Sequence, residues 1–290
     1  WFYPMKFYLA SCFREGSLPY WCPYYFCGAP FLSDIQSGVF YPLSVIPALF
    51  SYSKALNFYI SLHFFLGFLF FYYFLRSQGL SIRASLVVSI SYSYGSYSIA
   101  SINTVNNLST MIWLPALLWA FQRTESRGYP SGYFWAVSCL CMLFLGGEPQ
   151  LAIMVIVLLV FNPLFFTESK RLNIRSWVRS SMTIFFLVLS ALLITMVQLG
   201  PTFLDYQLSV RTGGFQFSEA TQFSLSPAML KHLFLPLVFP ANYESDPLVL
   251  NGLFPDTGSM PWLLTIYPGM MILPLALFGL VFSFSRRMLF

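Results

Sequence analysis

Residues 55–75, ALNFYISLHFFLGFLFFYYFL, decide the fold class, because they run for 21 positions without a charged side chain. A helix that crosses a bilayer needs about 20 mostly apolar residues, so this stretch predicts a membrane span. The whole chain is 57% hydrophobic and 9% charged, whereas soluble domains carry about 25% charged residues. The composition therefore predicts an integral membrane protein and excludes a soluble enzyme.

Six further stretches predict spans, at residues 84–101, 108–121, 133–145, 151–166, 180–199 and 262–284. The first of these six is rich in serine and tyrosine, and hydroxyls need partners in lipid, so one of its faces is expected to line a protein interior or a wet cavity. The sequence GGEPQ at 146–150 separates two of the stretches, because Gly and Pro interrupt helices. We therefore expect an all-α fold: a polytopic transmembrane helical bundle of about seven spans, with loops on its outer face.

The expected spans divide the chain into four parts. Residues 1–54 form a first extracytoplasmic loop with amphipathic segments, and residues 55–199 form a six-span transmembrane core. Residues 200–261 form a second large extracytoplasmic loop, and residues 262–290 supply a further span. The chain begins at Trp1 and ends just after two arginines, so we expect a fragment of a longer protein, incomplete at its N-terminus and continuing beyond its last residue.

The charged side chains predict how the spans are oriented. If the loops after the first, third, fifth and seventh spans are cytoplasmic, they hold ten Lys and Arg against two Glu, a net charge of +8. The other side then holds five basic side chains against eight carboxylates, a net charge of −3. This distribution follows the positive-inside rule. The overall charge of +5 therefore reflects topology and does not predict nucleic-acid binding.

The opening segment 16–42, GSLPYWCPYYFCGAPFLSDIQSGVFYP, is neither a span nor a polar linker. The run before it, 1–14, is amphipathic and is expected to lie on the membrane surface. One interpretation is that the aromatic side chains anchor the chain at the interface, where Trp and Tyr are enriched. The other is that a proline-stiffened outer loop presents its carboxylate, Asp34, to a pocket at the membrane edge. If the loop is extracytoplasmic, Cys22 and Cys27 could pair.

Two more outer positions are candidates for chemistry. Glu148, in GGEPQ, lies at the tip of a predicted hairpin, where a carboxylate is costly unless it is paired or hydrated. A tip that reaches water would leave it merely solvated. Arg211, in the sequence SVRTGG, could hold a phosphate bidentately, or could be a solvated loop residue. Lys231 and His232 form a weaker cationic site.

Three asparagines lie between the second and third expected spans. These residues, Asn103, Asn106 and Asn107, are candidate contacts for sugar hydroxyls, although a simple turn explains them at least equally well. His63, in the middle of the first span, is expected to be a hydrogen-bonded interior residue. Motifs typical of metal sites, P-loops and dinucleotide-binding folds are absent from the sequence, so any metal ligands remain unknown.

The pattern Gly-x-Leu-Pro-x-Trp-x-Pro-Tyr-x-Phe-x-Gly-x-Pro at 16–30, followed by QSGVFYPL at 36–43, resembles the bacterial YfhO-like membrane proteins. Shorter similarities follow in order along nearly the whole chain: Asn57 and His63, WLP at 113–115, GEPQ at 147–150, QLGP at 198–201 and SVR at 209–211. The resemblance implies a GT-C-type glycosyltransferase, and a span and an acidic residue ahead of Trp1. The chain departs from the family at Glu148, where a histidine is expected.

A family of this kind takes a sugar from a polyprenyl-phosphate carrier at the outer face of the bacterial cytoplasmic membrane, so the resemblance implies this carrier and membrane lipids as partners. The transfer needs a carboxylate to take the acceptor's proton and cations to stabilise the departing phosphate. Asp34 and Glu148 are thus the candidate catalytic residues, with Asp34 activating the acceptor or binding a divalent metal. Arg211 is the candidate phosphate ligand.

Two interpretations without catalysis compete with this one. A transporter of lipid-linked sugars should show paired broken helices in two matching halves, and the sequence shows only one clear break, at 146–150. A membrane scaffold would leave the outer carboxylates scattered.

Overall fold

The computed structural model describes residues 2–127, 130–166, 174–214 and 216–221, and beyond these only 230, 233–234, 267, 272, 274–279 and 281. The chain divides into two compact units: Trp1–Ser89 with Ile102–Thr212, and Ile90–Ser101 with Gly213–Phe290. Within the described ranges the only strands are β1 (Trp21–Cys22) and β2 (Ala29–Pro30), which pair antiparallel. The predicted all-α class is therefore confirmed.

The predicted first span is the centre of helix α3 (Tyr52–Ser77). Among the described residues, α3 and α10 (Ile174–Leu208) are the helices long and apolar enough to cross a membrane, which is fewer than the seven predicted spans. Much of α10 exposes large apolar side chains, such as Phe185, Leu193 and Ile194. A soluble protein would bury such a surface, so the exposed side of α10 suits contact with lipid.

The second and third predicted spans are interrupted helices, which corrects the expectation of continuous ones. The second consists of α4 (Ile82–Ser93) and α5 (Ser96–Ala100), and Gly95 precedes α5 as its N-cap residue. The third consists of α6 (Val105–Met111) and α7 (Trp113–Arg127). Pro115 explains this second break, because its ring has no N–H and would clash with the carbonyl of Met111 in a continuous helix.

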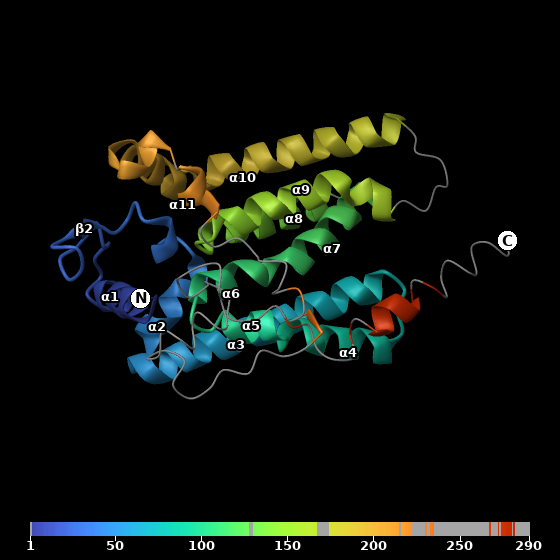
Figure 1. Ribbon diagram of the computed structural model, residues 1–290, viewed down its shortest axis with the longest axis horizontal. Helices are drawn as coiled ribbons and strands as arrows, with labels where there is room; N and C mark the ends of the chain where they lie inside the picture. Colours follow the sequence, from blue (N-terminus) through green and yellow to red (C-terminus); the bar gives the residue numbers. More distant parts are fainter. Residues whose placement is uncertain are drawn as a thin grey trace. The chain divides into compact units, whose positions relative to one another are not determined.

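The predicted hairpin is confirmed as α8 (Pro130–Leu145) and α9 (Pro149–Phe166), joined by the turn at 146–148. Helix α8 contacts α7, α9 and α10, and α9 and α10 run beside it (Figure 1). Their shared core consists of fully buried side chains, among them Leu117, Phe121, Leu140, Leu143 and Leu187. This core fixes the position of the turn that carries Glu148.

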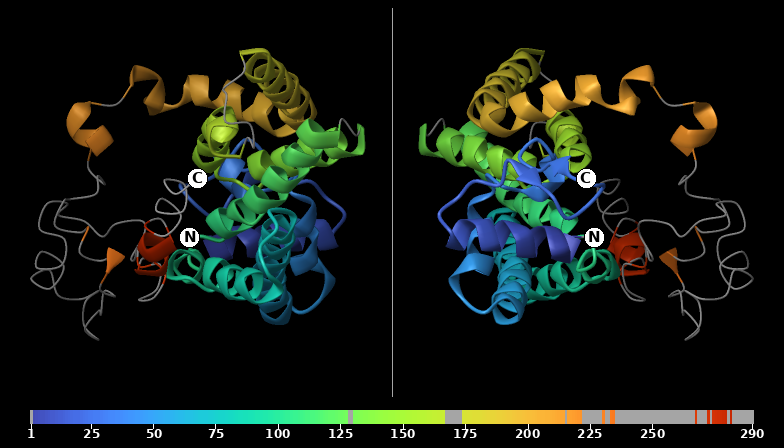
Figure 2. Two further views of the ribbon diagram at one scale, coloured as in Figure 1. Left: turned by 90° about the vertical axis from the view of Figure 1, so that its right-hand side faces the viewer. Right: turned by 90° about the vertical axis from the view of Figure 1, so that its left-hand side faces the viewer.

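The amphipathic run predicted at the start of the chain is helix α1 (Phe2–Arg14), which runs crosswise to α3 (Figures 1 and 2). The chain then continues through β1, β2, the 3₁₀ turns η1 (Ile35–Ser37) and η2 (Pro42–Val45), and helix α2 (Ile46–Leu49). The Arg14 guanidinium donates to the carbonyl oxygens of Pro47 (3.0 Å), Ala48 (3.1 Å) and Phe50 (2.6 Å). Because these are terminal carbonyls of α2, Arg14 fastens α1 to the end of that helix.

Helix α10 does not end at residue 199, the predicted end of the sixth span, after which the second outer loop was expected to begin. It continues through Pro201 to Leu208 and is followed by η3 (Val210–Gly213) and α11 (Phe217–Thr221). A proline removes one helical hydrogen bond but need not end a helix that is held by tertiary contacts. The predicted last span, 262–284, lies largely outside the described residues.

A candidate active site at the Asp34 loop

Residues 32–38, which we call the Asp34 loop, are held by the C-terminal part of α10. The Gln198 side-chain amide donates to the carbonyl oxygen of Leu32 (2.8 Å), and the Thr202 hydroxyl donates to the carbonyl oxygen of Ser33 (2.7 Å). The Ser33 hydroxyl in turn donates to Asp205 Oδ2 (3.1 Å). Residues four and three positions apart share one face of a helix. The continuation of α10 past residue 199 is therefore what positions this loop.

Asp34 is half-buried at the start of η1. Its Oδ1 accepts a hydrogen bond from the backbone N–H of Gln36 (2.9 Å), which makes it the N-cap of the turn. Gly38 ends the turn with φ +62°, a left-handed conformation that favours glycine. Asp34 thus has a structural role within its own loop.

The turn that carries Glu148 contacts the Asp34 loop directly. A methyl group added at Gly147 would lie 3.1 Å from the carbonyl oxygen of Ile35 and 3.3 Å from the Cα of Gln36. Gly147 also has φ +100°. Both the close approach and the backbone conformation require glycine here. Asp34 and Glu148, which are far apart in sequence, therefore belong to two segments in contact.

Glu148 is half-buried and hydrogen-bonded by a side chain of α6. Asn106 Nδ2 donates to Glu148 Oε2 (2.8 Å) and to the carbonyl oxygen of Gly147 (3.3 Å). Burial raises the pKa of the Glu148 carboxyl above its usual value, and the Asn106 hydrogen bond opposes that rise because it favours the ionised form. A carboxylate with a raised pKa is suited to accept a proton near neutral pH.

A buried lysine lies behind the Asp34 loop. Lys6 is 2% exposed, and its Nζ donates to the carbonyl oxygen of Ser37 (3.0 Å) and to the Ser44 hydroxyl (3.2 Å). Gly38 leaves the space for it, since a methyl group there would lie 2.8 Å from Nζ. Burial lowers the pKa of Lys6 from 10.5 to about 8, although the negative charge of Asp34 opposes that fall.

A series of buried hydrogen bonds lies next to this lysine. Trp113 Nε1 donates to the Tyr41 hydroxyl (3.0 Å), which is 2.9 Å from His63 Nε2. His63 Nδ1 is 2.6 Å from the carbonyl oxygen of Tyr59, and the Tyr59 hydroxyl is 2.6 Å from Ser109 Oγ. The prediction that His63 is a hydrogen-bonded interior residue is confirmed. These hydrogen bonds connect α3, α6 and α7 to the segment that follows the Asp34 loop.

Of the remaining predicted site residues, the structure describes the side chains of Asn103 and Asn107. Asn103 is exposed in the turn before α6, and Asn107 is half-buried on α6. Arg211 lies in η3, six residues after Asp205, and its side chain is outside the described part of the chain. Lys231 and His232 also lie outside the described residues. The asparagine that bonds Glu148 is Asn106, the third asparagine of the same predicted group.

The aromatic part of the opening segment lines a cavity of its own. Tyr20, Trp21 and Tyr24 are exposed and line a cavity of about 1200 Å³ between α1 and residues 17–25, and Asp34 is not among its lining residues. The pocket to which Asp34 was expected to be presented is thus not this cavity. Cys22 is buried and Cys27 is exposed, and both are free thiols, so the suggested disulfide is not formed.

The described part of the chain contains no ligand set for the suggested divalent metal. No group of three or more His, Cys, Asp or Glu side chains lies close enough there to hold a metal ion. The described contacts of Asp34, Glu148 and Asp205 are instead to hydrogen-bond donors of the protein.

The turn before Glu148 provides a stability test of this packing. A methyl group added at Gly146 would lie 2.5 Å from Thr110 Oγ1 and 3.0 Å from the Thr110 backbone N and Cα. We expect Gly146→Ala to destabilise the protein by about 1–3 kcal/mol, because the backbone of α6 would have to move. Thermal unfolding in detergent measures this. The matched control is Gly213→Ala, whose methyl group meets nothing within 4 Å; an equal loss in both variants would contradict the packing.

Comparison of the chain with protein-family models, with curated proteins and with solved structures finds no match in any of the three.

Proposed function

We propose that this chain belongs to a membrane glycosyltransferase that moves a sugar from a polyprenyl-phosphate carrier to an extracytoplasmic acceptor. The observation that carries the proposal is the meeting of the Asp34 loop, the Glu148 turn and the end of α10. Sequence similarities to YfhO-like proteins occur in these same segments and at His63 and Trp113. The proposal places the site at the outer face of a GT-C-like bundle of about seven spans in the bacterial cytoplasmic membrane.

The proposed chemistry gives each carboxylate a task. Glu148 takes the proton of the acceptor hydroxyl, the acceptor oxygen attacks the anomeric carbon, and the carrier phosphate leaves with the bonding electron pair. General-base catalysis requires a carboxylate that is ionised yet basic, and a half-buried Glu148 with a raised pKa meets this requirement. Asp34 shapes the loop beside it, and Arg211 is proposed to hold the phosphate, with Lys231 and His232 as further cations.

Two buried acceptor atoms support a polar ligand at this place. Asn106 Oδ1 and Gln198 Oε1 have no hydrogen-bond partner among the described residues. Each belongs to a side chain whose amide nitrogen already holds the Glu148 turn or the Asp34 loop. Buried acceptors are nearly always satisfied, by protein or by ordered water. Water or sugar hydroxyls reaching these amides would satisfy them, so the proposal uses Asn106 in place of Asn103 and Asn107 as a substrate-facing asparagine.

The test is a transfer assay in membrane vesicles from cells that produce the whole protein, with radiolabelled polyprenyl-phosphate sugars as donors. Asp34→Asn should reduce transfer at least tenfold, because it removes the negative charge beside Lys6, while the asparagine Oδ1 can still accept from the Gln36 N–H and cap η1. The matched control is Glu125→Gln in α7, where Oε2 accepts from the Ser180 hydroxyl far from the loop. Wild-type transfer by Asp34→Asn, at normal expression, would refute this site.

One observation favours the transporter as a second candidate. The described chain contains helix breaks at Gly95 and at Ile112 in addition to the turn at 146–148. Broken helices are common around substrate sites of transporters. The two functions differ in the product: a transporter moves a fluorescent lipid-linked sugar across the vesicle membrane intact, whereas a transferase separates the sugar from its carrier.

A further inference from the structure

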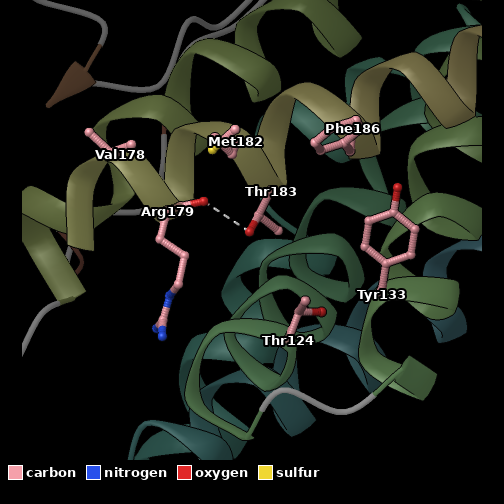
Figure 3. Close-up of a pocket in the computed structure, with 7 residues that line it drawn as sticks. All are labelled: Thr124, Tyr133, Val178, Arg179, Met182, Thr183 and Phe186. Atoms are coloured by element: carbon pink, nitrogen blue, oxygen red, sulfur yellow. Dashed lines mark hydrogen bonds between the residues drawn. The ribbon is translucent and has the colours of Figure 1, made fainter. Parts of the chain in front are cut away.

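A second pocket, of about 570 Å³, opens near the start of α10 and is separate from the Asp34 loop. It is lined by one residue each of α7 and α8 and by five residues of α10 (Figure 3). Gln198, which holds the Asp34 loop, lies 19 residues after Arg179 of this pocket. At 1.5 Å per residue this is about 28 Å along the helix, close to the roughly 30 Å thickness of a bilayer's hydrocarbon core. The two sites therefore lie at opposite surfaces of a membrane that α10 would cross.

Three of the five α10 residues that line the pocket are apolar, and the other two are Arg179 and Thr183. Val178, Met182 and Phe186 line it at intervals of four residues, which places them along one face of the helix. Figure 3 shows the Arg179 side chain extending from α10 toward the end of α7 that carries Thr124. The pocket thus combines a cationic group at one end with an apolar wall about two helical turns long.

The hydroxyl groups that line this pocket already donate within the protein or have a hydroxyl partner. Thr183 donates to the carbonyl oxygen of Arg179 (3.1 Å), and Thr124 donates to that of Ala120 (3.0 Å). The Tyr133 hydroxyl is 2.9 Å from Ser190 Oγ. Their capacity to bind a further acceptor is therefore small.

Arg179 differs from these hydroxyls. It donates from one nitrogen to the carbonyl oxygen of Glu125 (3.3 Å) and is exposed, whereas a guanidinium carries five N–H donors. The nearby carboxylate of Glu125 accepts from the Ser180 hydroxyl and does not line the pocket. An acceptor that enters the pocket would consequently be held by the guanidinium.

We propose that this pocket binds an anionic phospholipid of the inner leaflet. The lipid phosphate accepts hydrogen bonds from Arg179, and one acyl chain lies along Val178, Met182 and Phe186. The sequence supports the charge complementarity, because residues 167–179 hold four basic side chains and one acidic one. Basic pockets between helices on the cytoplasmic side suit anionic headgroups. The proposal rests on the orientation of α10 and not on the proposed transfer activity.

The test measures lipid binding to the purified whole protein by native mass spectrometry, with phosphatidylglycerol and phosphatidylcholine of identical acyl chains. We expect the wild type to prefer phosphatidylglycerol at least tenfold. Arg179→Gln should abolish the preference, and Arg179→Lys should keep part of it because the charge remains. The matched control is Arg83→Gln, which removes an exposed arginine from the same predicted side of the membrane. Size-exclusion chromatography of each variant confirms that the measured protein is folded.

Three results would overturn the proposal. The first is an equal affinity of the wild type for the two lipids, and the second is an unchanged preference in Arg179→Gln. The third is that inorganic phosphate binds at the concentrations used for lipid or displaces phosphatidylglycerol; we expect it to do neither. If phosphate alone binds as tightly, the apolar wall contributes nothing and the ligand is not a lipid.

Discussion

Glu148→Gln should lower the rate of sugar transfer by about 10²–10⁴-fold, the range that general acid–base groups contribute. Glutamine has nearly the same shape and can still accept the hydrogen bond from Asn106, so the Glu148 turn should keep its contact with the Asp34 loop. The loss would then reflect the missing basic oxygen. Initial rates of transfer in vesicles measure it, with the double variant Glu148→Gln/Gln150→Glu, which places a carboxylate at an exposed position in the first turn of α9. Rescue by that variant would show that a nearby negative charge suffices.

The dependence on pH gives a second, independent readout of the same role. A base must be ionised, so transfer should rise with pH through the raised pKa of Glu148. Asn106→Leu removes the hydrogen bond that favours the ionised form, so the pKa should rise further and the acidic limb of the profile should move to higher pH. A purely structural role of Asn106 would lower the rate at every pH without moving the limb.

The helical class and the hairpin were predictable because they depend on local composition. An uncharged run of 21 residues and a Gly-Gly-Glu-Pro interruption act over a few turns of chain, and α3 and the α8–α9 turn follow them. The helix breaks at Gly95 and Ile112 were not predicted, because they depend on single residues and not on the composition of a stretch. Hydropathy averages over a window, whereas a single Gly or Pro decides the backbone at one position. Pro115 was the signal that could have placed the second break.

The candidate site was only partly predictable, because its side chains come from distant segments. Asp34 and Glu148 stand out as carboxylates in apolar surroundings, but the contact between the segments that carry them depends on Gly147 fitting against Ile35. The sequence 198–201 is one of the similarities to the family, yet the predicted span ended at residue 199 and the residues after it were assigned to an outer loop. The structure instead uses the next turn, with Thr202 and Asp205, to hold the loop.

Lys6 is the clearest example of a residue that sequence could not assign. It lies on the amphipathic helix α1, where a lysine is expected to face water, and nothing nearby in sequence accounts for its burial. The partners that retain it, Ser37 and Ser44, lie more than thirty residues away. Only the fold of the Asp34 loop, with Gly38 leaving space for Nζ, explains why a cation occurs there.

This burial predicts a stability that rises at alkaline pH. The pKa of Lys6 is about 8 in the folded protein and 10.5 in a solvated chain. Between these pH values the unfolded chain binds more protons than the folded protein, so the free energy of unfolding increases with pH. A fall of this size corresponds to about 3 kcal/mol. Below pH 8 Lys6 is charged in the folded protein as well, so the full free-energy cost of burying that charge lowers the stability.

Lys6→Met isolates this contribution, because the many tyrosines that also titrate are common to both proteins. At pH 7 the variant loses two hydrogen bonds but also loses the buried charge, so its stability should be close to that of the wild type. By pH 11 the wild type should have gained about 3 kcal/mol relative to it. Urea unfolding in mixed micelles measures the difference, and Lys54→Met, which removes an exposed lysine at the start of α3, should follow the wild type throughout. If the difference between wild type and Lys6→Met stays constant from pH 7 to 11, then Lys6 is solvated and the Asp34 loop does not enclose it.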